Sequence, residues 1–244
     1  MVVRPRGSGL PYPRVLESIL SETTGEVWVV DNLSRVAAIA SDSSTYADRL
    51  VADQPEAIVI HYGHVEAVRR PHSRASWYRI HEVRPGSPRW RPLLNWFRVR
   101  SAGARRVVGL RRQWMTLASY ERALDELLGY LRSETLATLI LVEASPGNDR
   151  IERWGPGSLG QIARYNDVSQ RAASRFGAVW LSLEQAAGSS HDEVCPDGTH
   201  LSGEGHRRLA EVLASIVLER SGAARPRPGV SVSSSDGAPG RSPG

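Results

Sequence analysis

The stretch TLILV, from Thr138 to Val142, is a nearly continuous apolar run rich in branched side chains. Runs of this kind are typical of strands that are buried on both faces, as in a parallel sheet. Three similar runs lie along the chain: VWVV at 27–30, AIVI at 57–60 and AVWLSL at 178–183. Together the four runs predict a parallel sheet.

Amphipathic stretches separate these runs and predict helices. One begins at Pro13, and another carries leucines at 124, 127, 128 and 131. A third ends before Gly177, a residue suited to a helix C-cap, and the last follows Ser202, which can cap its N-terminus. Strands that alternate with helices imply right-handed βαβ crossovers, so we expect an α/β fold with three layers, an α/β/α sandwich.

Size and composition favour one domain over residues 1–222. The chain has 244 residues, 41% of them hydrophobic and 23% charged, which is ordinary globular usage. No stretch reaches the ~18 apolar residues of a membrane helix, and no signal peptide is recognisable, so we expect a cytoplasmic protein. The single cysteine, Cys195, rules out an intramolecular disulfide and zinc sites with two or more cysteines. We expect it to be a buried structural thiol.

Two segments depart from the α/β pattern. Residues 69–114 combine 13 arginines and one acidic residue with several tryptophans, and predict an insertion beside the carboxyl ends of the strands. Such a basic, aromatic segment could bind nucleic acid, an anionic membrane surface or a phosphorylated substrate. The competing interpretation, which we favour, is that arginine stems cover apolar surface. Residues 223–244 are rich in Pro, Gly and Ser and predict a disordered tail.

The strongest local motif lies at 197–200, where Asp197 precedes His200 by three residues in a loop before the last helix. In that spacing the carboxylate of Asp197 can accept the Nδ1 proton of His200 and turn Nε2 outward as a general base. A lone D-x-x-H is common by chance, however, so the spacing alone favours a solvated loop over a catalytic pair.

The longer run DGTHLSGEGHRRLAEVL, from Asp197 to Leu213, resembles the last signature block of the SGNH or GDSL hydrolases. The stretches IARYNDVSQRAASRFGAVWLSL and AIVIHYGHVEAVRRP resemble two further parts of that family, and the matched pieces are scattered from about residue 10 to 220. The resemblance implies a flavodoxin-like parallel sheet with the site at the carboxyl ends of the strands. It also implies a small-molecule ester or acyl substrate and no cofactor.

Residue by residue, the resemblance is uneven. It implies a general base at His200 and its orienting acid at Asp197. Gly63 falls where the family has a glycine after its third strand, and Glu66 where the family has an aspartate. Val65 replaces the family's oxyanion-hole asparagine, and a valine side chain cannot donate a hydrogen bond. Oxyanion donors would then come from backbone N–H groups or an arginine.

The nucleophile block is the weakest match. The family's GDS motif follows its first strand, whereas this chain offers Gly7-Ser8-Gly9 with only Met1 to Val3 as a strand before it. One interpretation makes Ser8 a relocated nucleophile on a shortened strand. The other, which we slightly favour, is that the strand and its GDS lie upstream of Met1.

Two further groups of polar residues complete the candidates. Asn32 and Arg35 follow the second strand of the family pattern and either line the site or form a polar turn. His61 and His64 have the spacing H-x-x-H, but no third ligand is evident, so we expect no metal.

Three functions remain open at this stage. The first is an SGNH-type ester hydrolase or acyltransferase that works through Ser, His and Asp. The second is a catalytically degenerate binding protein of the same fold, a pseudoenzyme. The third, ranked last, is the binding of nucleic acid or another anionic group by the insertion at 69–114.

Overall fold

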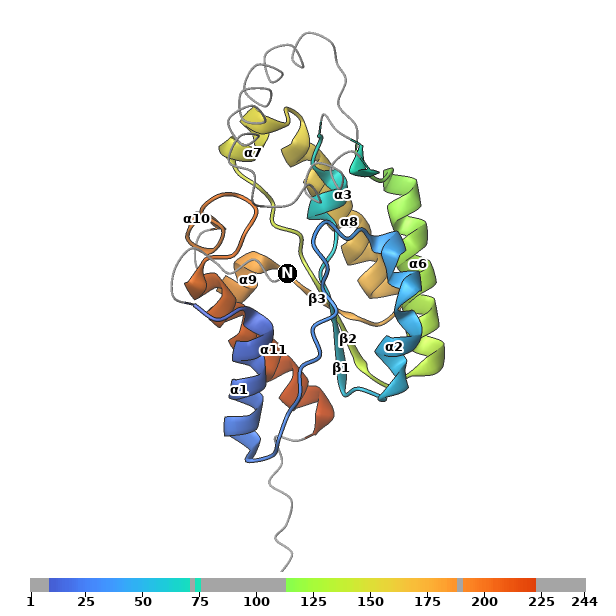
Figure 1. The fold of residues 1–244 in the computed structure, drawn as a ribbon, viewed down its shortest axis with the longest axis vertical. Helices are drawn as coiled ribbons and strands as arrows, with labels where there is room; N and C mark the ends of the chain where they lie inside the picture. Colours follow the sequence, from blue (N-terminus) through green and yellow to red (C-terminus); the bar gives the residue numbers. More distant parts are fainter. Residues whose placement is uncertain (1–8, 71–72, 76–112, 188–190, 223–244) are drawn as a thin grey trace, which may run out of the picture.

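A parallel sheet lies at the centre of the molecule (Figure 1). In the computed structural model, residues 9–70, 73–75, 113–187 and 191–222 are described. Their sheet contains β1 (Ala57–Ile60), β2 (Thr138–Val142) and β3 (Val179–Leu181), in the order β1-β2-β3. Both pairs are parallel, with Val59 opposite Ile140 and Leu141 opposite Trp180. Three of the four apolar runs are thus confirmed as parallel strands.

Helices cover both faces of the sheet. Alternate residues of each strand point to opposite faces, so each strand contributes side chains to two cores. Ile58, Ile60 and Leu139 belong to a core with α6 (Leu117–Glu134) and α8 (Ser158–Arg175). Ile140 and Val142 belong to a second core with α1 (Tyr12–Thr24) and α11 (Gly203–Ser221). Figure 1 shows the two helical layers on either side of the strands. The expected three-layer α/β/α fold is confirmed.

Local signals explain where the long helices begin and end. Pro13 occupies the first turn of α1, and the Ser202 hydroxyl accepts a hydrogen bond from the Gly205 amide at the start of α11. Gly177, just beyond α8, has a φ of 62°, a left-handed conformation that glycine adopts without strain. The shorter helices are η1 (Ala40–Thr45), α2 (Ala47–Ala52), α3 (His64–Ala67), α7 (Asp149–Trp154), α9 (Leu183–Ala187) and α10 (His191–Val194).

The predicted strand at 27–30 is wrong. This segment pairs with no strand of the described chain. Trp28 and Val30 pack on the second core, and their amides donate to side chains of α1. Val27 and Val29 point outward and are 93% and 80% exposed. The apolar residues of this segment therefore pack on one side, against the core that contains α1 and α11. They do not form a strand, because a strand also needs a hydrogen-bonded neighbour.

The outer edge of β1 is consequently open in the part of the chain that the structure describes. Glu56 C=O accepts from Thr138 N–H, so alternation directs Ile58 and Ile60 toward β2 and Ala57 and Val59 away from it. Neither Ala57 nor Val59 has a backbone partner on that side among the described residues. An open edge next to exposed valines is unusual for a sheet that is otherwise covered by helices.

Most of the predicted insertion and the whole predicted tail, residues 76–112 and 223–244, lie outside the described residues. The residues at the two ends of the insertion are described, and they contact one another and η1. The Arg70 guanidinium lies over the Trp114 ring, 4.3 Å from its centroid, and Arg74 pairs with Asp42. None of the helices in the described ranges combines the length and the apolar character needed to cross a membrane.

Candidate functional site

The carboxylate of Asp197 organises the loop before α11. Its Oδ1 accepts hydrogen bonds from the backbone amides of Thr199, at 2.9 Å, and His200, at 2.7 Å. Its Oδ2 lies 2.8 Å from Nδ1 of the His200 ring. Because Nδ1 is engaged, Nε2 of His200 carries the free lone pair, and the side chain is 60% exposed. The structure therefore brings Asp197 and His200 into the geometry of an oriented general base.

The charge state of Asp197 suits that arrangement. Burial by itself raises the pKa of this carboxyl, but the hydrogen bonds from His200 and Thr199 outweigh burial and lower the pKa below its usual value. Asp197 is thus ionised at neutral pH and can stabilise a positive charge on the His200 ring.

Two other histidines, His64 and His206, have pKa values lowered by burial. Burial, with a smaller contribution from the positive charge of Arg70, lowers the pKa of His64 to about 4. His64 is the first residue of α3, directly after Gly63, and it bonds to Ser145, whose hydroxyl bonds to the Gly198 carbonyl in the loop of His200. Burial also lowers the pKa of His206 of α11, whose Nδ1 accepts the amide hydrogen of Tyr12 at 3.2 Å.

The contact between the start of the described chain and α11 bears on the candidate nucleophile. Gly9 packs so closely on Gly203 that a Cβ at Gly9 would lie 2.9 Å from the Gly203 Cα. Gly203 is three residues beyond His200. Ser8, the residue before Gly9 in the sequence, lies outside the described residues.

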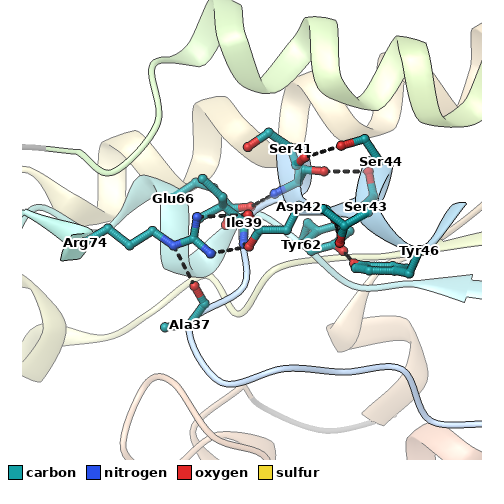
Figure 2. Close-up of polar contacts among 12 residues, drawn as sticks. Ala37, Ile39, Ser41, Asp42, Ser43, Ser44, Tyr46, Tyr62, Glu66 and Arg74 are labelled. Atoms are coloured by element: carbon teal, nitrogen blue, oxygen red, sulfur yellow. Dashed lines mark hydrogen bonds and ion pairs between the residues drawn. The ribbon is translucent and has the colours of Figure 1, made fainter. Parts of the chain in front are cut away.

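Gly63 and Glu66 form a buried unit rather than an exposed binding surface. Glu66 is 0% exposed, and its two carboxylate oxygens accept the amide hydrogens of Ala40, at 2.8 Å, and Gly63, at 3.0 Å. Figure 2 shows Glu66 within the polar network around η1, near the pair of Arg74 and Asp42. Burial raises the pKa of Glu66 to about 7.

This geometry corrects the expected role of Glu66. A carboxyl group without exposed surface does not contact a substrate, so Glu66 instead holds the backbone turn at Gly63. The Gly63 amide is consumed by that bond and does not point to an open site as a free donor. Val65 is half-buried and packs on the first core, so it contributes no polar group either.

Asn32 lines a surface hollow that includes neither Asp197 nor His200. Its side-chain oxygen accepts from the Ser34 amide at 3.0 Å, as in an Asx turn. The hollow is also lined by Arg35, Tyr46 and Arg49. No hydrogen bond among the described residues connects Asn32 with Asp197 or His200, so the structure favours the polar-turn interpretation.

His61 and His64 both bond to the backbone that extends β2. The His61 ring bonds to backbone of Glu143, and His64 Nδ1 donates to the Ser145 carbonyl at 3.3 Å. Within the described ranges, no three His, Cys, Asp or Glu side chains converge as a metal site would require. The two histidines thus join the end of β1 to the end of β2.

The sequence analysis missed Ser145 and His191. The Ser145 hydroxyl lies 3.0 Å from His191 Nε2 and 3.0 Å from the Gly198 carbonyl oxygen. Only the position of Ser145 just after β2, at the carboxyl edge of the sheet, could have drawn attention to it. Cys195, beside Ser145, is buried as expected, and burial raises its pKa to about 11.

Comparisons with known proteins give matches in structure only. No family model matches the chain, and no curated protein matches it by sequence. A lipase/acylhydrolase from Enterococcus faecalis superimposes with a TM-score of 0.56 at 17% identity, over 86% of this chain and 85% of that one. The acetylxylan esterase Axe2 from Geobacillus stearothermophilus gives 0.55 at 16%, over 88% and 82%.

A third solved structure, from Desulfitobacterium hafniense, is described as a lipolytic protein of the G-D-S-L family. It gives a TM-score of 0.51 at 14% identity, over 84% of this chain and 87% of that one. At such identities the likeness shows the fold. The chain therefore has an SGNH/GDSL hydrolase-like fold, in agreement with the motif at 197–213.

Proposed function

We propose that the protein is an SGNH-type ester hydrolase or acyltransferase in which His200 is the general base and Asp197 orients it. The observation that carries the proposal is the bond of 2.8 Å between Asp197 Oδ2 and His200 Nδ1, in a loop at the carboxyl end of a parallel sheet. Hydrolases with the same fold act on esters, as the names of the lipase and the acetylxylan esterase state.

The proposed reaction has two stages, acylation of a serine and deacylation. A serine Oγ attacks the ester carbonyl carbon while His200 Nε2 takes the hydroxyl proton, which leaves a tetrahedral oxyanion. When the oxyanion collapses, the bond to the leaving oxygen breaks and His200 gives its proton to the departing alcohol. Water or a second alcohol then loses a proton to His200 and attacks the acyl carbon. The bond from that carbon to the serine Oγ breaks, His200 returns the proton to Oγ, and the acid or new ester leaves.

Ser8 is the proposed nucleophile. Its neighbour Gly9 packs on Gly203, three residues from His200, and this contact supports the proposal. Ser145 is unsuited to the role because it is 3% exposed and its hydroxyl proton is donated to the Gly198 carbonyl. The Gly9 amide, directly after Ser8, is a candidate backbone donor to the oxyanion.

A pseudoenzyme is the second candidate, and a specific observation favours it. Val65 offers no donor where the family has asparagine, and Glu66 occupies the Gly63 amide at 3.0 Å. Loss of one oxyanion donor elsewhere costs about 10²–10³ in rate. A binding protein that keeps the His200 loop would show the same features.

Labelling by a fluorophosphonate and hydrolysis of 4-nitrophenyl acetate separate the two candidates. An enzyme should label and turn over, and Ser8→Ala and His200→Ala should each reduce both signals by at least about 10³-fold. Ser34→Ala, at an exposed serine of the Asn32 turn, serves as the control and should match the unmodified protein. If the unmodified protein neither labels nor turns over, the pseudoenzyme takes the place of the hydrolase. Labelling that survives Ser8→Ala would assign the nucleophile to another serine.

A further inference from the structure

Ser145 occupies a junction between the sheet and the loop of Asp197 and His200. It follows the end of β2 by three residues and is 3% exposed. Its hydroxyl reaches the Gly198 carbonyl and His191 Nε2, both at 3.0 Å, and its own carbonyl accepts from His64 at 3.3 Å. One residue therefore contacts the segment 191–200 on one side and the first residue of α3 on the other.

The directions of these bonds are fixed by the available protons. The Gly198 carbonyl can only accept, so the Ser145 hydroxyl donates its proton there. The Ser145 oxygen must then accept from His191, whose Nε2 carries the hydrogen. The proton and one lone pair of the hydroxyl are thereby used within the protein.

The internal bonds of the loop do not fix where the loop lies. Within the described ranges Asp197 bonds only to Thr199 and His200, so this unit would keep its shape if the loop shifted as a body. Other hydrogen bonds of the segment 191–202 stay within it or run into the first turn of α11, such as Ser202 hydroxyl to Glu193 carbonyl at 3.0 Å. Among the described residues, Ser145 is the only partner that ties the segment to the sheet by hydrogen bonds.

Packing at Gly198 shows that the loop sits tightly at this junction. Gly198 has a φ of 76°, and a Cβ there would lie 2.4 Å from the Asn148 side-chain oxygen. Asn148 caps α7 by accepting from the Arg150 amide at 3.1 Å. The Gly198 peptide is therefore held between Ser145 and the cap of α7.

We propose that Ser145 is a positioning residue that sets the place of His200 relative to the end of β1. The inference rests on the proposed function, since a displaced His200 lowers the reaction rate without changing the ring's bond to Asp197. A general base must come within hydrogen-bond reach of its proton, so a shift of about 1 Å is costly.

The test compares Ser145→Ala with Ser43→Ala. Ser43 is a matched control because it is also a buried serine, 4% exposed, that donates to a backbone carbonyl, that of Ala40, at 2.6 Å in η1. Both variants should lose similar thermal stability. Only Ser145→Ala should speed hydrogen exchange of the Thr199 and His200 amides, by about 5- to 10-fold, as expected for one lost hydrogen bond.

Turnover of 4-nitrophenyl acetate gives the second readout. Ser145→Ala should lower kcat by about tenfold or more with KM unchanged, whereas Ser43→Ala should leave kcat at its original value. Unchanged exchange at Thr199 and His200 would overturn the inference. So would faster exchange with an undiminished kcat in an active protein.

A second variant covers the case in which Ser145→Ala does not fold. His191→Leu removes one of the two bonds and keeps the bond from Ser145 to Gly198, so it should accelerate the same exchange by a smaller factor. No acceleration would overturn the inference. If exchange becomes faster in both Ser145→Ala and His191→Leu but the unmodified protein has no esterase activity, Ser145 still holds the loop in place and the proposed function fails.

Discussion

Asp197 holds His200 at two points, the backbone amide through Oδ1 at 2.7 Å and ring Nδ1 through Oδ2 at 2.8 Å. The first bond shapes the loop, and the second fixes the ring tautomer. One side chain thus controls both where the imidazole lies and which of its nitrogens is basic.

The variant Asp197→Asn should separate these two roles. Its side-chain oxygen can still accept the amides of Thr199 and His200, but its NH₂ group faces Nδ1 and favours the wrong ring tautomer. We expect thermal stability close to that of the unmodified protein and a fall in kcat of about 10²–10⁴. Melting curves and ester hydrolysis measure the two effects. Full activity in this variant would remove Asp197 from the proposed mechanism.

Substitution at Gly63 tests the turn after β1. Its φ is 116°, and a Cβ would meet the Ala144 Cβ at 3.0 Å and the Tyr120 hydroxyl at 3.2 Å. Gly63→Ala should therefore lower the free energy of unfolding by about 1–3 kcal/mol, measured by urea denaturation.

Gly160→Ala is the matched control for this substitution. Gly160 lies in α8 with no atom within 4 Å of its added Cβ, so alanine there should be neutral or stabilise by up to about 1 kcal/mol. Equal effects at the two glycines would contradict the constraint at Gly63.

The buried carboxyl of Glu66 should make stability depend on pH. Its pKa is raised to about 7, above the value of about 4.5 in the unfolded chain, so the folded state binds the proton more tightly. The resulting stabilisation is complete below pH 4.5 and is lost as the pH rises toward 7, by at most about 1.4 kcal/mol per pH unit.

Comparison with Glu66→Gln isolates this effect, because other titrating groups are shared by the two proteins. The unfolding free energy of the unmodified protein, relative to that of Glu66→Gln, should fall as the pH rises from 4.5 to 7. Above pH 7 this difference should stay constant. A difference that does not change with pH would show that folding leaves the pKa of Glu66 unshifted.

Hydrogen exchange should report the open edge of β1. The amides of Ile58 and Ile60 face β2, whereas those of Ala57 and Val59 face away without a partner in the described chain. We expect Ile58 and Ile60 to be protected at least about tenfold more strongly than Ala57 and Val59. Uniform protection across the four residues would mean that the edge is covered in solution.

Local sequence determined much of this protein. Strands that are buried on both faces are continuous apolar runs, so TLILV, AIVI and part of AVWLSL could be predicted from the sequence. Ser202 and Gly177 indicated helix ends, because serine caps an N-terminus and glycine adopts the left-handed backbone of a C-cap. The pair of Asp197 and His200 was also predictable, since a three-residue spacing within one turn brings the two side chains together without help from distant residues.

Tertiary structure decided what depends on contacts between distant segments. Residues 27–30 have the composition of a strand, but strand formation requires a hydrogen-bonded neighbour that the described chain does not provide. Glu66 looked like a site residue until burial and its bonds to Ala40 and Gly63 gave it a structural role. Ser145 carries no sequence signature at all, because its importance lies in reaching Gly198, which is 53 residues away in the chain and adjacent only after folding.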